Sequence, residues 1–267
     1  MRPYKAARLR FERAIKHGER LSKLWNDIPS GFLCTPKAKI DRDGNAVLIA
    51  TNVGEIPDEL SLVLGEHLYQ LRSALDSLIY QATVYATAKN PPPREGSLEF
   101  PITSDPSEWP ELAKRRLRDL PPGVQKGIES VQPYHSLLLP PEEQVTSIGR
   151  SLSILHDLAR KDRHRQLHIV GSWPLEVKPD FDLPPGVSLR LFETMPPSLI
   201  EEGTVIAKYT LDGYVSGMSI SIAPNLKTNF GCAEPPPACH PTDTFDRRLA
   251  EMVNAVGSVL VAFEKNF

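Results

Sequence analysis

The chain has 267 residues, of which 40% are apolar and 24% are charged, a mixture that excludes wholesale disorder and suffices for a buried core. A formal net charge of -2 excludes a global attraction to nucleic acids or membranes, so any such binding would need a local patch. The sequence has no run near the roughly 20 apolar residues of a membrane helix and no apolar signal core at its start. It has three cysteines, an odd number, which does not suit a framework of disulfides. A cytoplasmic location is therefore expected.

The first predicted helix runs from Pro3 to Trp25. Its apolar residues alternate steps of three and four, which is a heptad seam suited to packing along another helix. The seam consists of Tyr4, Ala7, Phe11, Ala14, Gly18, Leu21 and Trp25. Basic residues beside it could contact phosphates, but Glu12 and Glu19 interrupt the charge, which favours a solvated face.

Residues 37–51 predict a β-hairpin, because Asp43-Gly44 tolerates the positive φ of a tight turn between two extended runs. The longest helix is predicted next, from Ile56 to Asn90, with leucines every three or four positions along one side. Arg72 and Asp76 border this apolar stripe. They are four residues apart, so they are placed to pair with each other and to meet polar groups from another helix.

The prolines at 91–93 are expected to end this helix, and a short extended segment is expected after them at Phe100-Pro-Ile102. Helices are then predicted over Ser107–Asp119 and Gly123–Val131, and a longer one over Glu142–Asp162. The first of these carries a local cluster of positive charge, for which solvation is the expected role. The cluster consists of Lys114, Arg115, Arg116 and Arg118.

From Arg165 onward the apolar period changes toward two, which predicts strands. The predicted strands are Leu167–Trp173, Val187–Phe192, Thr204–Leu211 and Ser216–Ala223. Asp212-Gly213 predicts a hairpin between the last two, so the sheet is expected to be antiparallel. A final helix is predicted from Thr242 to Glu264, with a second apolar seam.

Helices flank a block of strands instead of alternating with each strand, which favours an α+β fold with a helical bundle packed against a small antiparallel sheet. We expect a single domain over 1–267. Within it, 1–165 is mainly helical apart from the hairpin, 166–230 forms the strands, and 242–265 is the last helix.

Four short motifs carry a family resemblance over residues 60 to 170. They are Leu-Arg-Ser-Ala-Leu-Asp at 71–76, Phe100-Pro-Ile102, Ile128-Glu-x-x-Gln-Pro-Tyr134 and Asp162-Arg-His-Arg165. In this order they resemble a widespread family of uncharacterised bacterial proteins, which brings no established activity. That family usually has histidine where this chain has Ser77, and lysine where it has Arg163. If the usual histidine were catalytic, this chain would be impaired.

The resemblance implies that polar residues of these motifs come together in space. The expected network consists of Arg72, Asp76, Tyr134, Asp162, His164 and Arg165. Charged groups beside apolar helix faces are costly to bury unless they pair, so such a network could fix how the helix from 142 packs on the helix from 57. A catalytic role is the alternative interpretation.

A second resemblance is to ribonucleases of the HEPN kind, helical domains with an arginine and a histidine four to six residues apart on one helix. The resemblance implies that the arginine stabilises phosphate charge and that the histidine transfers protons. Arg150 and His156 fit with five residues between them, and His164 is a further catalytic candidate. Other arginines also fit, so the spacing hardly discriminates. They are Arg163 with His168, and Arg10 with His17.

No metal or cofactor is predicted. His164 and His168 lack a third ligand at diagnostic spacing, and Cys232, Cys239 and His240 lack the short loops of zinc knuckles. The sequence therefore predicts a non-enzymatic cytoplasmic protein with an interaction or regulatory role, binding a partner or a second copy of itself through helices 3–25 and 242–264. The alternative is a metal-independent ribonuclease with a toxin or phage-defence role, for which RNA is the substrate. No membrane association is predicted.

Overall fold

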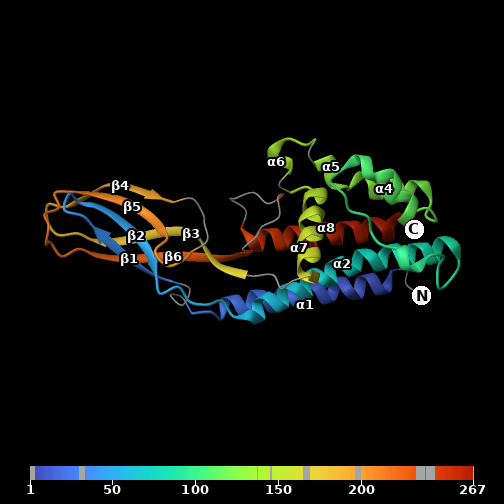
Figure 1. The fold of residues 1–267 in the computed structure, drawn as a ribbon, viewed down its shortest axis with the longest axis horizontal. Helices are drawn as coiled ribbons and strands as arrows, with labels where there is room; N and C mark the ends of the chain where they lie inside the picture. Colours follow the sequence, from blue (N-terminus) through green and yellow to red (C-terminus); the bar gives the residue numbers. More distant parts are fainter. Residues whose placement is uncertain are drawn as a thin grey trace. The chain divides into compact units, whose positions relative to one another are not determined.

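A computed structural model describes residues 4–29, 34–136, 138–144, 146–164, 169–195, 200–232, 238 and 244–266. The chain divides into two compact units (Figure 1), each built from separate stretches of sequence. The helical unit comprises 1–23, 61–167 and 236–267, and the β unit comprises 24–60 and 168–235. The sequence predicted one domain over 1–267, and that stays a prediction. The two units arise because the hairpin near residue 45 pairs with strands from beyond residue 168, which gives the strands a core of their own.

The α+β class is confirmed, since the chain contains long helices and antiparallel sheets. The described helices are α1 (Lys5–Asn26), α2 (Asp58–Thr87), α3 (Trp109–Arg116), α4 (Pro122–Ser130), α5 (Pro133–Ser136), α6 (Pro141–Gln144), α7 (Ile148–His164) and α8 (Phe245–Asn266), with 3-10 turns η1 (Glu95–Ser97) and η2 (Pro106–Glu108). The predicted helix over 142–162 is interrupted after Gln144 and resumes at Ile148. None of the described helices is both long enough and apolar enough to cross a lipid bilayer.

The helical unit is organised around α2. Its leucine stripe is fully buried, including Leu64, Leu68, Leu71 and Leu75. Helix α1 runs antiparallel to α2, because the Ala7 N–H donates to Gln81 while His67, nearer the start of α2, bonds to the Ala14 carbonyl oxygen.

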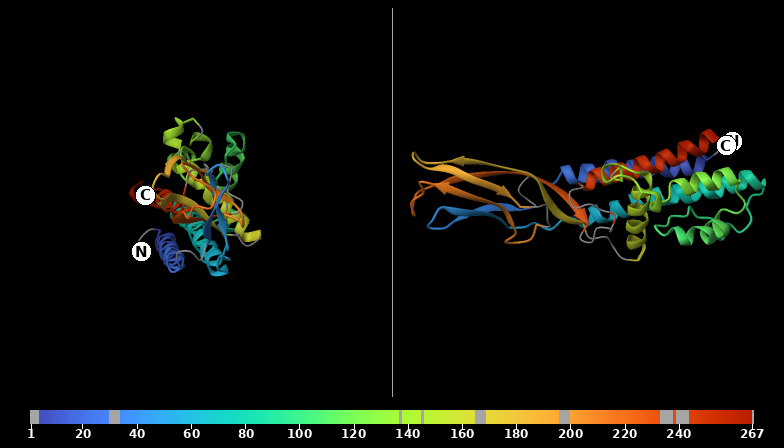
Figure 2. Two further views of the ribbon diagram at one scale, coloured as in Figure 1. Left: turned by 90° about the vertical axis from the view of Figure 1, so that its left-hand side faces the viewer. Right: turned by 90° about the horizontal axis from the view of Figure 1, so that it is seen from above.

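Helix α8 also runs antiparallel to α1, so the start of α1 lies beside the end of α8 (Figure 2). The Tyr4 and Phe263 rings meet edge to face with centroids 6.0 Å apart, and a Cβ atom at Gly257 would lie 3.1 Å from the ring of Phe11. The apolar seams of both helices therefore face the interior of the helical unit.

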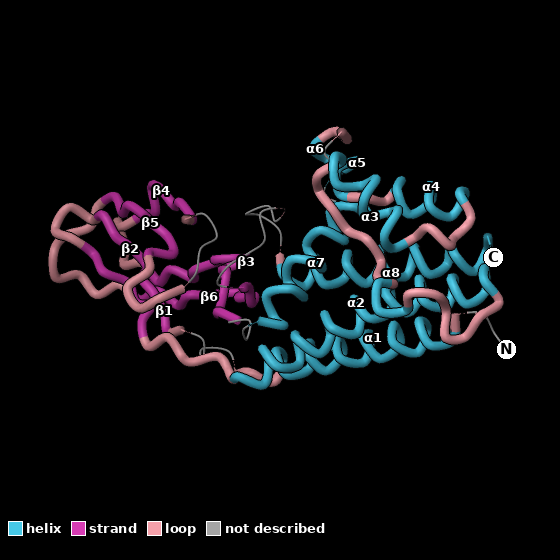
Figure 3. The backbone as a smooth tube through the Cα atoms, turned by 45° about the vertical axis from the view of Figure 1, so that its right-hand side comes forward, coloured by secondary structure: helices cyan, strands magenta, loops and turns pink. Residues whose placement is uncertain are grey.

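The β unit contains two antiparallel sheets (Figure 3). The four-stranded sheet has the order β1-β2-β5-β4 and the two-stranded sheet pairs β3 with β6. The strands are β1 (Thr35–Ile40), β2 (Asn45–Thr51), β3 (Ile169–Asp182), β4 (Ser188–Thr194), β5 (Val205–Asp212) and β6 (Ser221–Cys232). The Phe181 ring of β3 packs on the Tyr209 ring of β5 with centroids 5.3 Å apart, so the two sheets share an apolar core.

The hairpin predicted at Asp212-Gly213 is wrong. Gly213 does have positive φ (76°), but β5 already has β2 on one side and β4 on the other, so it has no free edge for a following strand. Instead β6 begins only at Ser221 and pairs along the length of β3. The alternation around residue 220 predicted a strand but did not specify its partner.

Candidate functional site

Arg72 and Asp76 of α2 hold the backbone of Phe100. The Nη2 nitrogen of Arg72 donates to the Phe100 carbonyl oxygen at 2.6 Å and pairs with the Asp76 Oδ1 atom at 3.0 Å. The same carboxylate oxygen accepts the Phe100 N–H at 3.0 Å. Both backbone polar groups of this fully buried residue are thereby satisfied by side chains, as a neighbouring strand would satisfy them.

Gln132 does the same for the next residues of that segment. Its Nε2 atom donates to the carbonyl oxygens of Pro101 and Ile128, each at 3.0 Å, and its Oε1 atom accepts the Thr103 N–H at 3.0 Å. Gln132 is completely buried. We call Arg72, Asp76 and Gln132 the backbone clamp, because together they hold residues 100–103 without a partner strand.

Further charges surround Arg72. Burial lowers the pKa of the Arg72 guanidinium, the carboxylates of Asp76 and Glu99 oppose that shift, and the charges of Arg116 and Arg163 add to it. Burial raises the pKa of Asp76, and the Arg72 charge opposes it. Arg116 is itself paired with Glu99 at 2.9 Å. Arg72 remains charged at neutral pH, so the pair is an ionic contact in a largely dry environment.

His156 of α7 lies within the electrostatic influence of the same arginine. Burial, followed by the Arg72 charge, lowers the pKa of His156 to about 4, so the imidazole is neutral at pH 7. Its Nδ1 atom and the Arg72 Nη1 atom are both buried without a hydrogen-bond partner among the described residues. A guanidinium can only donate and a neutral imidazole can accept, so these two atoms are chemically complementary.

The other residues of the expected network have their own surroundings where they are described. A Cβ atom at Gly65 would lie 2.6 Å from both carboxylate oxygens of Asp162, so Asp162 packs on α2 near its start. His164 is exposed. Tyr134 stacks on His135 with ring centroids 4.5 Å apart, and burial and the Glu129 charge raise its pKa. Arg165 and His168 lie outside the described residues.

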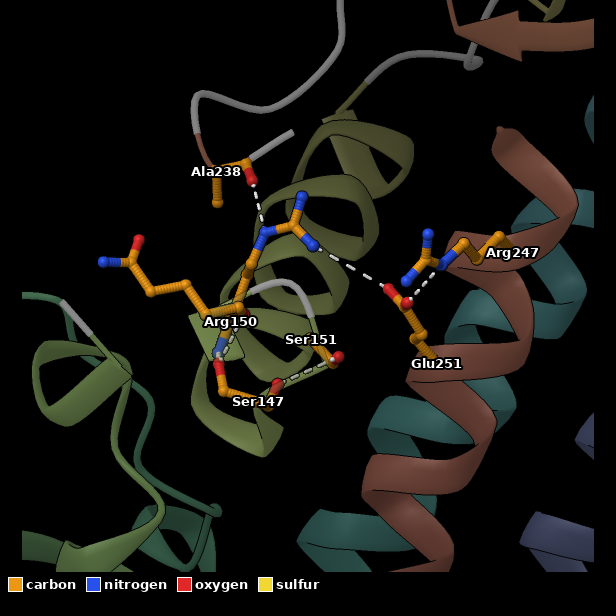
Figure 4. Close-up of polar contacts among 7 residues, drawn as sticks. Ser147, Arg150, Ser151, Ala238, Arg247 and Glu251 are labelled. Atoms are coloured by element: carbon orange, nitrogen blue, oxygen red, sulfur yellow. Dashed lines mark hydrogen bonds and ion pairs between the residues drawn. The ribbon is translucent and has the colours of Figure 1, made fainter. Parts of the chain in front are cut away.

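Arg150 belongs to a separate polar cluster between α7 and α8 (Figure 4). Its Nε atom donates to the Ala238 carbonyl oxygen at 2.9 Å, and its Nη1 atom lies 3.8 Å from the Glu251 carboxylate. Glu251 also accepts from Arg247 at 2.9 Å. The Arg150 and Glu251 side chains retain only 10% and 13% exposure, so this contact joins α7 to α8 in the interior.

Arg150 and His156 therefore face different neighbours. Arg150 contacts Glu251 of α8 and the Ala238 carbonyl oxygen. His156 is instead influenced by the charge of Arg72 on α2 and by charges on its own helix, those of Asp157, Arg160 and Arg163.

A pocket of about 560 Å³ opens beside α4 and α8. Its lining side chains are all uncharged: Phe100, Pro121, Gly123, Val124, Gly127, Ile128, Val131, Ile148, Ser258, Val259, Ala262 and Phe263. Phe100 connects this pocket to the backbone clamp. The volume falls in the range typical of small-molecule sites.

No group of three or more metal-ligating side chains is assembled within the described ranges. Cys34 is a buried free thiol, and burial raises its pKa, which keeps it protonated. The side chain of Cys232, and all of Cys239 and His240, lie outside what the structure describes.

Two important residues were missed by sequence reasoning. Gln132 was noted only as part of a motif, and Glu251 was not considered. A buried amide that bonds to backbone groups has no characteristic spacing, so the only usable signal is a glutamine directly before a proline, just after a predicted helix ends.

The comparison of the chain with protein-family models, with curated proteins and with solved structures found no match.

Proposed function

We propose that this protein is a non-enzymatic, cytoplasmic binding protein with an interaction or regulatory role. The observation that carries the proposal is the backbone clamp. Arg72 and Asp76, which the sequence assigned to a polar network with a structural or a catalytic role, use their polar atoms to hold Phe100. Arg150 is similarly engaged with Glu251 and Ala238.

Binding of a partner or a second copy through helices 3–25 and 242–264 stays a prediction, and a second candidate surface supports the proposal. The apolar seams of α1 and α8 were proposed to bind a partner or a second copy, but they pack against the interior of the helical unit, with Tyr4 against Phe263. The apolar pocket beside α4 and α8 is therefore the better candidate for the binding surface.

A ribonuclease of the HEPN kind is the second candidate, and one observation favours it. His156 is neutral at pH 7 and lies near the Arg72 charge, as a general base beside a phosphate-stabilising cation would. The pair differs from the one that sequence spacing suggested, because the arginine comes from α2.

The test is incubation of purified protein with RNA in the presence of a chelator, using wild type, His156→Ala, His164→Ala and, as a matched control, His135→Ala. We expect no cleavage above the background of a mock purification. Cleavage that is abolished by His156→Ala and retained by His135→Ala would establish the ribonuclease instead. Light scattering across a concentration series tests self-association in the same samples, and a monomer at high concentration would exclude the homo-oligomer.

A further inference from the structure

We propose that the pocket beside α4 and α8 binds a small uncharged ligand with an aromatic or branched aliphatic body. This rests on the proposed binding function and names the class of ligand. The pocket has a volume of about 560 Å³, and its walls come from α4, α8, the start of α7 and Phe100. Phe100 and Ile128 belong to the lining but are only 0% and 1% exposed, so a ligand would contact chiefly the outer lining residues of α4 and α8.

The chemistry of the walls specifies a neutral ligand. No lining residue carries a charge, and Ser258 contributes the hydroxyl. A ligand with a carboxylate, phosphate or ammonium group would lose hydration without gaining a counter-charge, which is strongly unfavourable. Burial of an apolar ligand body makes the binding free energy more favourable in proportion to the apolar surface removed from water. A single hydroxyl or ring N–H on the ligand can bond to Ser258 or to solvent at the pocket mouth.

Two glycines keep the pocket open. Gly123 and Gly127 lie one turn apart on α4, and both line the pocket. A Cβ atom built at either position would meet nothing within 4 Å, so the space that their side chains would fill is empty. Glycine inside a helix costs about 1 kcal/mol relative to alanine. Helix stability alone therefore favours a larger residue at Gly127, whereas an open pocket requires a small one.

The walls are also held in place before any ligand arrives. The backbone clamp fixes Phe100 through both of its polar groups, and Phe263 packs edge to face on Tyr4. A preformed wall loses little conformational entropy when a ligand binds, which favours affinity for small molecules.

Indole is a suitable probe, because it is neutral, bicyclic and carries one donor, and indole-3-acetate is its charged counterpart. We would titrate both into the full chain and follow binding by isothermal calorimetry and by backbone amide NMR shifts. The pocket-filling variants are Gly127→Leu and Gly123→Leu. Gly96→Leu is the matched control, since a Cβ atom there also meets nothing within 4 Å but Gly96 does not line the pocket.

We expect indole to bind with shifts at Val124, Ile128 and Val259, and indole-3-acetate to bind at least about tenfold more weakly. Gly127→Leu should reduce indole affinity by about tenfold or more while keeping or raising the melting temperature, so binding and stability move in opposite directions. Gly96→Leu should leave affinity within about twofold. Gly123→Leu repeats the test if the first variant folds poorly.

The inference would be overturned by no indole binding up to its solubility limit, by equal affinity in wild type and both filled variants, or by preference for indole-3-acetate. A change in oligomeric state on filling the pocket would show that a second copy occupies it, which also overturns the inference. The RNA assay separates this from the proposed function. Cleavage with intact indole binding refutes only the non-enzymatic role, whereas no cleavage and no indole binding refutes only the ligand class.

Discussion

The N–H of Phe100 donates to the carboxylate of Asp76, which lies 24 residues earlier in the chain, at 3.0 Å. This bond joins the middle of α2 to the extended segment that leads into α3. The same carboxylate oxygen pairs with Arg72. One charged side chain therefore neutralises a buried guanidinium and also fixes the position of an aromatic residue that lines the apolar pocket.

Asp76→Asn isolates the charge in this arrangement, because asparagine keeps an oxygen that can accept the Phe100 N–H. We expect it to lower the free energy of unfolding by about 3 kcal/mol, since it leaves Arg72 buried without its counter-charge. The value lies at the low end for buried pairs because the Asp76 side chain keeps 32% exposure. Urea denaturation measures the change.

Glu111→Gln is the control for that experiment. Glu111 and Lys114 form an ion pair at 3.9 Å with 83% and 75% of their side chains exposed. Breaking it should change stability by less than about 1 kcal/mol. Equal effects of the two substitutions would contradict a structural role for the Arg72–Asp76 pair.

Gln132→Leu removes the amide that holds Pro101 and Thr103. The backbone groups left unpaired are buried, and each costs about 1–3 kcal/mol, so we expect the variant to be among the most destabilised single substitutions in the helical unit. Gln144→Leu is the matched change at an exposed site, where Nε2 donates to the Leu139 carbonyl oxygen at 2.8 Å. It should cost about 1 kcal/mol or less. Thermal denaturation of both variants decides the comparison.

The helical glycines Gly65 and Gly127 should respond oppositely to alanine. At Gly65 the new Cβ would lie 2.6 Å from the Asp162 carboxylate oxygens, so the Asp162 side chain must move away from α2. Overpacking of this kind costs about 1–3 kcal/mol. At Gly127 the Cβ meets nothing within 4 Å, so the variant should gain up to about 1 kcal/mol from helix propensity. A Gly65→Ala variant as stable as wild type, or more stable, would refute the Asp162–Gly65 contact.

Stability should depend on pH through His156. Its pKa is about 4 in the folded chain against 6.5 for an unperturbed histidine, so between these values the unfolded chain binds a proton that the folded chain does not. The free energy of unfolding should therefore fall as pH falls from about 6.5 to about 4, and the contribution of His156 should be fully present above that window. The lowered pKa of His67 acts in the same direction.

The effect is isolated by comparing wild type with His156→Gln, since His67 is common to both. Urea midpoints measured at several pH values should decline less steeply in the variant. Parallel curves would mean that His156 is not the depressed group.

Local patterns predicted much of the helical unit. The leucine spacing of α2 follows from a helix that buries one side, and the proline runs marked its end. The heptad seam of α1 was also a true buried stripe, but periodicity could not say that its partner would be α8 of the same chain. An apolar seam indicates that a helix packs against another helix. Which helix that is depends on contacts between residues far apart in the sequence.

The strands show the same limit more sharply. The alternation over 204–211 correctly predicted β5, but it could not indicate that β5 pairs with the distant strand β2 as well as with β4.

Asp162 and Arg163 show the same limit within a polar motif. They are adjacent in a polar motif, but the helix turns Asp162 toward Gly65, whereas the charge of Arg163 acts on Arg72. Neighbouring residues of a helix point about 100° apart, so two adjacent residues of one motif contact different partners.

The interleaving of the two units along the chain sets an order for biosynthesis. The last strand of the β unit, β6, ends at Cys232, so that unit can close while α8 is still inside the ribosome. Helix α1 is synthesised before α8, so Phe263 cannot pack on Tyr4 until α8 has emerged from the ribosome. Before α8 emerges, α2 can already pack on α1, but the side of α1 that faces α8 stays uncovered, and apolar surface of this kind is what chaperones recognise.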